Sequence, residues 1–250
     1  MLNITPILAF QDNYIWLIDN GTYATVVDPG DAVPVMAALD QRALRLTNIL
    51  ITHHHADHIG GVDGLISKCS PQVFAPEKEQ YAFNHTPVHD GEIIYIQDLN
   101  LSLNVMDVGG HTLGHIAYYG ANSLFCGDTL FGGGCGRIFE GSPEQMFSSV
   151  QKIGKLPTNT AVYCAHEYTE HNLQFAILVE KNNPALNNRI TTTRKLREAG
   201  LPSMPSSIQL ELATNPFLRC DSTEIKRTLD LQHNSALDVF TTLRQMRNKF

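Results

Sequence analysis

Cysteine is scarce in this sequence, and the few cysteines form no pattern. The 250-residue chain has five of them, an odd number that is widely scattered, and no two form a C-x-x-C pair. Such usage is no disulfide framework and is typical of a protein from a reducing compartment. Cys126 and Cys164 fall on predicted strands and are expected in the core.

Long hydrophobic runs and an excess of positive charge are also lacking. No stretch reaches the roughly 20 apolar residues that a membrane span requires. The N-terminus, MLNITPILAFQDN, lacks the positive segment and long apolar run of a signal peptide. A formal net charge of −7 argues against a nucleic-acid-binding face, which needs clustered lysine and arginine. We therefore expect a soluble cytoplasmic protein that binds neither membrane nor nucleic acid.

The residues that are present suit a globular protein with strands and helices mixed along the chain. Hydrophobic residues make up 43% and charged residues 17%, which fits a sizeable core. Short β-prone runs predict strands at residues 4–9, 14–19, 24–27, 48–52, 73–75, 101–107, 116–119, 123–126 and 161–164. Apolar periodicity predicts helices at 33–44, from the Gly60-Gly61 break to 68, and from Pro143 to 155.

The last third of the chain shows a different pattern, because helical periodicity occurs there almost without strand signals. The predicted helices cover residues 172–180, 184–199, 222–231 and 236–249. Strands mixed with helices, followed by helices alone, indicate two domains. We expect an α/β domain over residues 1–168 and a small helical domain over residues 169–250.

The 11 histidines are the compositional exception, and several gather after one predicted strand. In the segment THHHADH (residues 52–58), an extended chain would point His53 and His55 to the same side. A turn then brings Asp57 and His58 to the start of the next helix. Imidazole nitrogen and carboxylate oxygen suit Zn, Fe or Mn. Four candidate ligands in so short a segment favour two adjacent ions over one.

Three further segments each place one such side chain after a predicted strand. They are GHTLGH with His111, GDT with Asp128 and AHE with His166. Strand ends give rigid positions, and small neighbouring residues let the backbone approach an ion. For one histidine alone, a hydrogen-bonded core position or a solvated turn would be the simpler interpretation. Four sites of this kind together favour a metal centre.

Taken together, these segments resemble the metallo-β-lactamase superfamily. Its motifs T-H-x-H-x-D-H, G-H-T-x-G-H and G-D-T, and a late histidine, occur here in order. Within the superfamily, the stretches GDTLF, GCGR, AHEYT and NPFLR are similar to the glyoxalase II (hydroxyacylglutathione hydrolase) family. The similarity runs from the N-terminus to the last residue. It implies an α/β fold of the αββα sandwich type with a small C-terminal helical domain.

Carried over by position, the resemblance implies a ligand set for two divalent metal ions. One ion is assigned to His53, His55 and His111, the other to Asp57, His58 and His166, and Asp128 bridges them. Zn is the most favoured metal, and the ligand types leave Fe and Mn open. His54 and His115 match the motifs but are not ligands in the family. We expect His115 in the core or beside the ligands.

The expected chemistry is hydrolysis of a thioester. Two adjacent cations lower the pKa of a bridging water and supply hydroxide near neutral pH, with Asp57, His58 and Asp128 as the catalytic residues. A thiol with a pKa of about 8.5 leaves as thiolate without an acid beside it. The resemblance implies a substrate of the S-(2-hydroxyacyl)glutathione class, such as S-D-lactoylglutathione. Its hydrolysis to glutathione and D-lactate is the second step of methylglyoxal detoxification.

Basic residues and a tyrosine are expected to bind the glutathione moiety. The positions that match the family pattern are Arg137, Tyr168, Arg244 and Arg247. Arg247 stands where lysine is common, which keeps the charge and changes the geometry. Phe139 stands where some members have tyrosine, which removes one hydroxyl contact. We expect the chain to bind this small molecule as a monomer.

Four other functions fit the sequence less well. An RNA-processing nuclease needs a basic channel, which the net charge of −7 opposes. A lactonase or β-lactamase has no use for a glutathione-binding helical tail. A mononuclear-iron sulfur dioxygenase would dispense with the second-metal ligands, yet Asp57, His58 and His166 are all present. A non-catalytic metal sensor is expected to have lost a ligand, and none is missing.

Overall fold

The computed structural model describes residues 2–250, which form two compact units. One unit runs to Asp107 and resumes over Thr112–Gly127, and the other consists of Val108–His111 and Asp128–Phe250. Neither unit is therefore a continuous stretch of sequence. The predicted division between residues 168 and 169 does not coincide with these limits, and it stays a prediction.

The first unit is built on a six-stranded sheet with the order β1-β2-β3-β4-β5-β6. The strands are β1 (Asn3–Ala9), β2 (Asn13–Asp19), β3 (Tyr23–Val27), β4 (Arg45–Leu50), β5 (Gln72–Pro76) and β6 (Thr86–Val88). Pairing is antiparallel from β1 to β3 and parallel from β3 to β6. Since parallel strands end at the same edge, the segments that follow β3 and β4 are neighbours.

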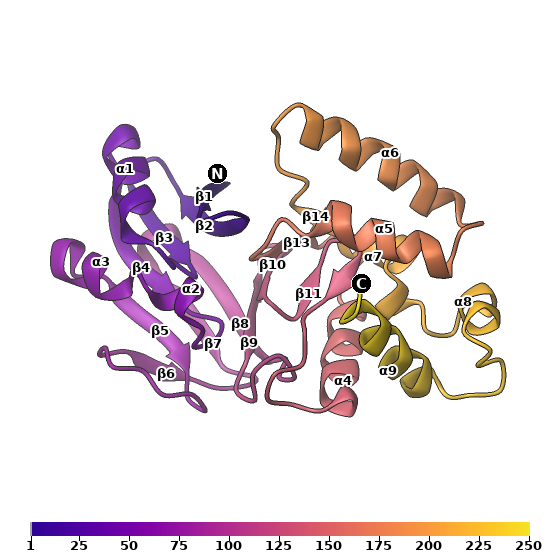
Figure 1. The fold of residues 1–250 in the computed structure, drawn as a ribbon. Helices are drawn as coiled ribbons and strands as arrows, with labels where there is room; N and C mark the ends of the chain where they lie inside the picture. Colours follow the sequence, from indigo (N-terminus) through magenta and orange to yellow (C-terminus); the bar gives the residue numbers. More distant parts are fainter. Residues whose placement is uncertain (1) are drawn as a thin grey trace. The chain divides into compact units, whose positions relative to one another are not determined.

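Helices cover one face of this sheet (Figure 1). They are α1 (Ala32–Arg42), α2 (Ala56–Ile59) and α3 (Val62–Cys69). Alternate side chains of the strands, such as Ile49, pack with Leu39 of α1 and Leu65 of α3 in one apolar core. Burial of this stripe against the sheet stabilises the helices, which are short for independent stability.

The remaining strands of the first unit form an antiparallel group in the order β7-β8-β9-β10. The elements are β7 (Ile93–Ile96), the 3₁₀ turn η1 (Gln97–Leu99), β8 (Leu101–Asp107), β9 (Ile116–Gly120) and β10 (Ser123–Gly127). The buried hydroxyl of Tyr118 on β9 donates to Ile51 O at 2.9 Å. Burial raises the pKa of this phenol, so it remains a donor that ties the two groups of strands together.

The second unit is mainly helical. Its elements are β11 (Leu130–Phe131), β12 (Gly134–Cys135), α4 (Pro143–Gly154), β13 (Ala161–Cys164), α5 (Thr169–Val179), α6 (Pro184–Glu198), β14 (Ser206–Ser207), α7 (Ile208–Thr214), η2 (Pro216–Leu218), α8 (Thr223–Thr228) and α9 (Ala236–Arg247). β11 and β12 form an antiparallel hairpin, and β13 pairs with β14. Phe217 of η2 lies between Phe175 of α5 and Phe240 of α9, with ring centroids 6.3 and 5.5 Å away.

The predicted order of the elements is largely confirmed. Every predicted strand is present, and the helix predicted at 172–180 begins earlier, at Thr169. The helix predicted at 222–231 is shorter than expected and ends at Thr228. The predicted elements do not include α7, β6, β7, β14 or the hairpin β11–β12. Cys126 and Cys164 are buried as expected, and none of the five cysteines forms a disulfide. Across residues 2–250, no helix has the length and apolar character to cross a membrane.

Candidate active site

In the first unit, four of the predicted ligands lie between β4 and the end of α2. His53 Nε2 is 3.1 Å from His55 Nδ1, and the ring centroids of His53 and His58 are 4.1 Å apart. The His54 ring packs edge-on against that of His55, with 5.1 Å between the centroids, but its Nδ1 faces Glu79 Oε2 at 3.2 Å. This is the alternation expected of an extended chain after a strand.

Asp28 belongs to the same cluster, although no motif pointed to it. It follows β3 directly with a φ of 52° and accepts hydrogen bonds from Thr52 N and Thr52 Oγ1, both at 2.8 Å. Its Oδ2 is 3.1 Å from His58 Nδ1, a contact that fixes the imidazole and leaves Nε2 for a metal. Asp28 comes directly after β3, and β3 pairs in parallel with β4. This pairing makes Asp28 and Thr52 neighbours, which the sequence motifs alone do not indicate.

The donor set of this unit fits a divalent transition metal. Asp28, His53 and His58 each offer an atom that could bind an ion, these atoms lie within 4.8 Å of one another, and all are nitrogen or carboxylate oxygen. Asp57 Oδ2 lies 3.4 Å from His58 Nε2. A Cβ built at Gly30 would lie 1.8 Å from Asp57 O. Only glycine therefore lets the turn after β3 approach α2 so closely.

His115 is buried beside these ligands, as expected. Its ring stacks on that of His53 with 4.6 Å between the centroids. A Cβ at Gly127 would lie 2.8 Å from His115 Nε2, and Gly127 has a φ of 47°. Glycine at the end of β10 therefore leaves room for the His115 ring.

The other three predicted ligands, His111, Asp128 and His166, lie in the second unit. Asp128 Oδ2 is 3.4 Å from His111 Nε2, and Asp128 Oδ1 is 3.4 Å from His166 Nε2. The two oxygens thus face different imidazoles, which is the arrangement a bridging carboxylate would need. His111 Nδ1 lies 2.7 Å from Arg137 O. Donation to that carbonyl fixes the tautomer and leaves Nε2 for a metal.

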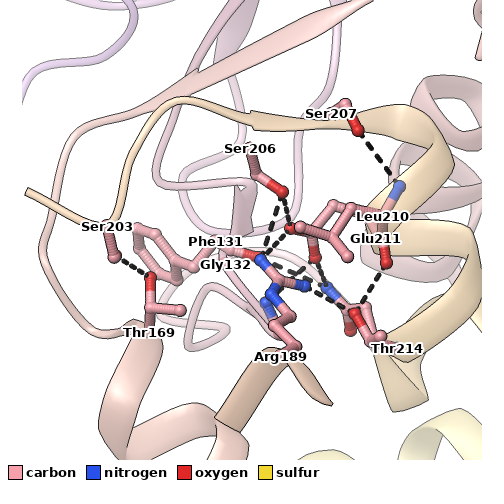
Figure 2. Close-up of polar contacts among 12 residues, drawn as sticks. Phe131, Gly132, Thr169, Arg189, Ser203, Ser206, Ser207, Leu210, Glu211 and Thr214 are labelled. Carbon is pink, nitrogen blue, oxygen red and sulfur yellow. Dashed lines mark hydrogen bonds and ion pairs between the residues drawn. The ribbon is translucent and has the colours of Figure 1, made fainter. Parts of the chain in front are cut away.

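Polar side chains from the helices hold the turn of the hairpin β11–β12, which follows Asp128 in the chain. Asn172 of α5 donates to Gly132 O at 3.1 Å, and Gly133 N donates to Glu211 Oε2 at 2.9 Å. Glu211 of α7 is fully buried and pairs with Arg189 of α6 at 2.5 Å (Figure 2). The glycine turn has no side chain of its own, so these groups decide where its backbone lies.

Arg137 and Tyr168, two of the predicted glutathione-binding residues, lie beside ligands of the second unit. Arg137 is exposed, and its guanidinium carbon is 5.9 Å from the centroid of the Phe139 ring. The Phe139 ring in turn packs edge-on against His111 at 5.2 Å. The Tyr168 ring is stacked on His166 with 4.7 Å between the centroids. Both positions suit contact with a molecule bound at these histidines.

Arg244 and Arg247 of α9 already have partners within the protein. Arg244 is buried and donates Nη1 to Cys135 O at 2.6 Å and to Gly136 O at 3.3 Å. Arg247 donates Nε and Nη2 to Asn172 Oδ1 at 3.2 and 3.1 Å. Burial and the charge of Arg244 lower the pKa of Arg247 from its ordinary value. Both arginines therefore brace the hairpin, whatever else they bind.

Comparison with known proteins gives two family matches that together span residues 9–250. Residues 9–166 match the metallo-beta-lactamase superfamily, and residues 167–250 match the hydroxyacylglutathione hydrolase C-terminus. The hydroxyacylglutathione hydrolase of Methylobacillus flagellatus is 56% identical over 250 residues, with 100% of each chain covered. That of Dechloromonas aromatica is 48% identical over 267 residues, again with 100% of each chain covered.

Solved structures with low identity agree on the fold. BLEG-1 B3 metallo-beta-lactamase has a TM-score of 0.64 at 23% identity and covers 87% of this chain and 99% of its own. ETHE1 from Myxococcus xanthus has a TM-score of 0.66 at 22% identity and covers 99% and 98%. The predicted metallo-β-lactamase fold with a C-terminal helical region is thus confirmed, and its histidine and aspartate clusters are suited to a binuclear metal site. On these matches, the chain belongs to the hydroxyacylglutathione hydrolase family of the metallo-β-lactamase superfamily.

Proposed function

We propose that this chain hydrolyses S-(2-hydroxyacyl)glutathione, such as S-D-lactoylglutathione, to glutathione and a 2-hydroxy acid, here D-lactate. The observation that carries the proposal is the complete set of predicted metal ligands in a chain that matches curated hydroxyacylglutathione hydrolases from end to end. The reaction would serve as the second step of methylglyoxal detoxification.

Two divalent metal ions would complete the site. We assign one to His53, His55 and His111, the other to Asp57, His58 and His166, and we assign Asp128 to both. The ligand types favour Zn and leave Fe and Mn open. When bound, such ions lower the pKa of a water molecule and polarise the acyl carbonyl.

We propose Asp57, His58 and Asp128 as the catalytic residues. Asp28 holds His58 through Nδ1 at 3.1 Å, so that Nε2 stays oriented for a ligand bond. Asp128 directs one oxygen to each of two imidazoles. The leaving thiol has a pKa of about 8.5, so the reaction needs no protonated side chain beside the sulfur.

We assign glutathione recognition to Arg137, Tyr168, Arg244 and Arg247, all in the second unit. Guanidinium groups suit the peptide carboxylates because they donate in a planar fork. The exposed side chain of Arg137 and the half-buried one of Arg247 supply this charge. In this proposal residues 1–168 form the catalytic domain and residues 169–250 the substrate-binding domain. We also propose that the chain acts as a monomer in the cytoplasm.

The test is a comparison of substrates on the metal-loaded protein. We expect S-D-lactoylglutathione to be hydrolysed with a far higher kcat/KM than a β-lactam or a phosphodiester. Faster turnover of either of the other two would overturn the substrate assignment.

Elemental analysis of the same preparation should find close to two ions per chain. Asp128→Ala should weaken the binding of both, because one carboxylate serves each of them.

A further inference from the structure

Asp57 belongs to a very short helix, and its side chain is partly exposed. Asp57 lies in the first turn of α2, which has four residues and whose N-cap, His55, makes no side-chain capping bond. Its side chain is 43% exposed. A helix this short is not stable by itself, and a carboxylate that is partly in solvent can occupy several rotamers. Contacts with rigid groups outside α2 would therefore help to fix the orientation of Asp57.

Asn13 supplies such a group from a rigid position. It is the first residue of β2, where its backbone pairs with Ala9, and it is only 7% exposed. Its Nδ2 donates to Asp57 Oδ2 at 3.0 Å and lies 3.5 Å from Asp57 O. One amide group thus reaches both the carboxylate and the backbone of the same residue.

The oxygen that Asn13 binds is the one nearest to the neighbouring ligand. Asp57 Oδ2 is also 3.4 Å from His58 Nε2. A carboxylate oxygen has two lone pairs, so it can accept the amide proton and still bind a cation. A neutral donor suits this position, because a lysine would repel the cation and a second carboxylate would repel Asp57.

We propose that Asn13 is a positioning residue for Asp57 and that it strengthens binding of one of the two metal ions. The inference rests on the proposed function, which assigns Asp57 to that ion. Partners that orient a metal ligand typically account for about 10–100-fold in metal affinity. An effect of this size should be confined to the ion that Asp57 binds.

Metal affinity of the full-length protein tests the inference. Metal-free wild type, Asn13→Ala and Asn13→Leu are titrated with Zn²⁺ against a chromophoric chelator. Leucine keeps the bulk of asparagine but cannot donate. We expect both variants to weaken one of the two binding events by about 10–100-fold and to leave the other unchanged.

Asn3→Ala is the matched control. Asn3 donates Nδ2 to Asp19 Oδ1 at 3.3 Å at the other end of the same β1–β2 pair, so its loss should change neither affinity. Unchanged affinities in both Asn13 variants, or an equal loss in both binding events, would overturn the inference. A wild type that binds a single ion would overturn the binuclear proposal as well, which distinguishes the two failures.

Discussion

Arg244 and Arg247 lie on the same helix, yet their guanidinium groups have different surroundings. Arg244 is buried against the carbonyls of Cys135 and Gly136. Arg247 is half-buried, and its Nε and Nη2 both donate to Asn172 Oδ1. Of the two, Arg247 is therefore better placed to be removed without collapse of the hairpin.

For this reason Arg247→Ala should affect binding more than chemistry. We expect KM for S-D-lactoylglutathione to rise by roughly 10- to 100-fold with kcat nearly unchanged, since a charge-assisted contact contributes about 1.5–3 kcal/mol. Steady-state kinetics measure both constants. A small thioester without the tripeptide serves as control and should show no change. An equal fall of kcat on both substrates would mean that Arg247 acts by bracing Asn172.

Gly136 offers a second test at a single residue, because a Cβ there would lie 1.9 Å from Asp128 O. Gly136→Ala should cost about 1–3 kcal/mol of stability through overpacking and should weaken metal binding by displacing Asp128. Thermal unfolding and metal content measure the two effects. Gly91→Ala is the control: Gly91 has a φ of 82° and no atom near its Cβ position, so that variant is strained but should keep its metal. Equal metal content in both variants would contradict this prediction.

Among the elements, those with local signals could be predicted and those held by distant groups could not. Helix α6 begins at Pro184, and the side chain of the preceding residue, Asn183, caps its first turn. Helix α7 has only seven residues and is fixed by the burial of Glu211 against Arg189, 22 residues away. A glutamate in a short segment gives no sign of such burial, because glutamate is mostly exposed in proteins.

The residues of the candidate site also differ in how far the sequence predicts them. The candidate metal ligands could be proposed because they stand in motifs at strand ends. Asp28 and Asn13 could not, since their contacts with His58 and Asp57 depend on how strands pair. The hairpin β11–β12 gives little strand signal, because its glycine-rich turn lacks β-prone residues and takes its position from helices far along the chain.

Glu180, at the end of α5, makes the stability of the helical elements depend on pH. Burial alone would raise the pKa of this carboxyl, but hydrogen bonds from Arg219, Ser222 and Asn183 outweigh burial and hold the pKa below its ordinary value. A depressed pKa stabilises the fold above the unfolded-state pKa of about 4.3. That contribution is lost as the pH falls through the folded-state pKa.

Glu180→Gln should therefore lower the free energy of unfolding at neutral pH by about 1.5–3 kcal/mol. It should also reduce the loss of stability on acidification below about pH 4. Urea unfolding over a series of pH values measures both effects. Glu198→Gln, at an exposed position of α6, is the matched control and should behave as wild type. A Glu180→Gln protein with an unchanged pH profile would refute the role of this carboxylate.

For the whole molecule, the family matches and the compact units divide the chain at different places. The superfamily match ends at residue 166, whereas the second unit already includes Asp128–Phe250. The hairpin β11–β12 falls inside the superfamily match, but its backbone is held by Asn172, Glu211 and Arg244. The backbone that follows Asp128 thus depends on the helices for its position, apart from the substrate-binding role that we propose for them.

A chain that ends at residue 168 should for this reason be poorly soluble and inactive even on a small thioester. Truncation removes the partners of several buried backbone groups, each of which costs about 1–3 kcal/mol when unsatisfied. Soluble yield, metal content and activity on both substrates measure the outcome. If the fragment were soluble and active on the small thioester, the helices would serve the substrate alone.

The discontinuous units also set an order of events during synthesis. The chain leaves one unit for the other after Asp107, His111 and Gly127, so the first unit is fully translated at residue 127. Val108–His111 are by then already made, but the rest of their own unit, Asp128–Phe250, has still to be translated. The contacts of Asp128 with both His111 and His166 can form only once residue 166 has left the ribosome. By this connectivity the second cluster of candidate ligands assembles later than the strands of the first unit.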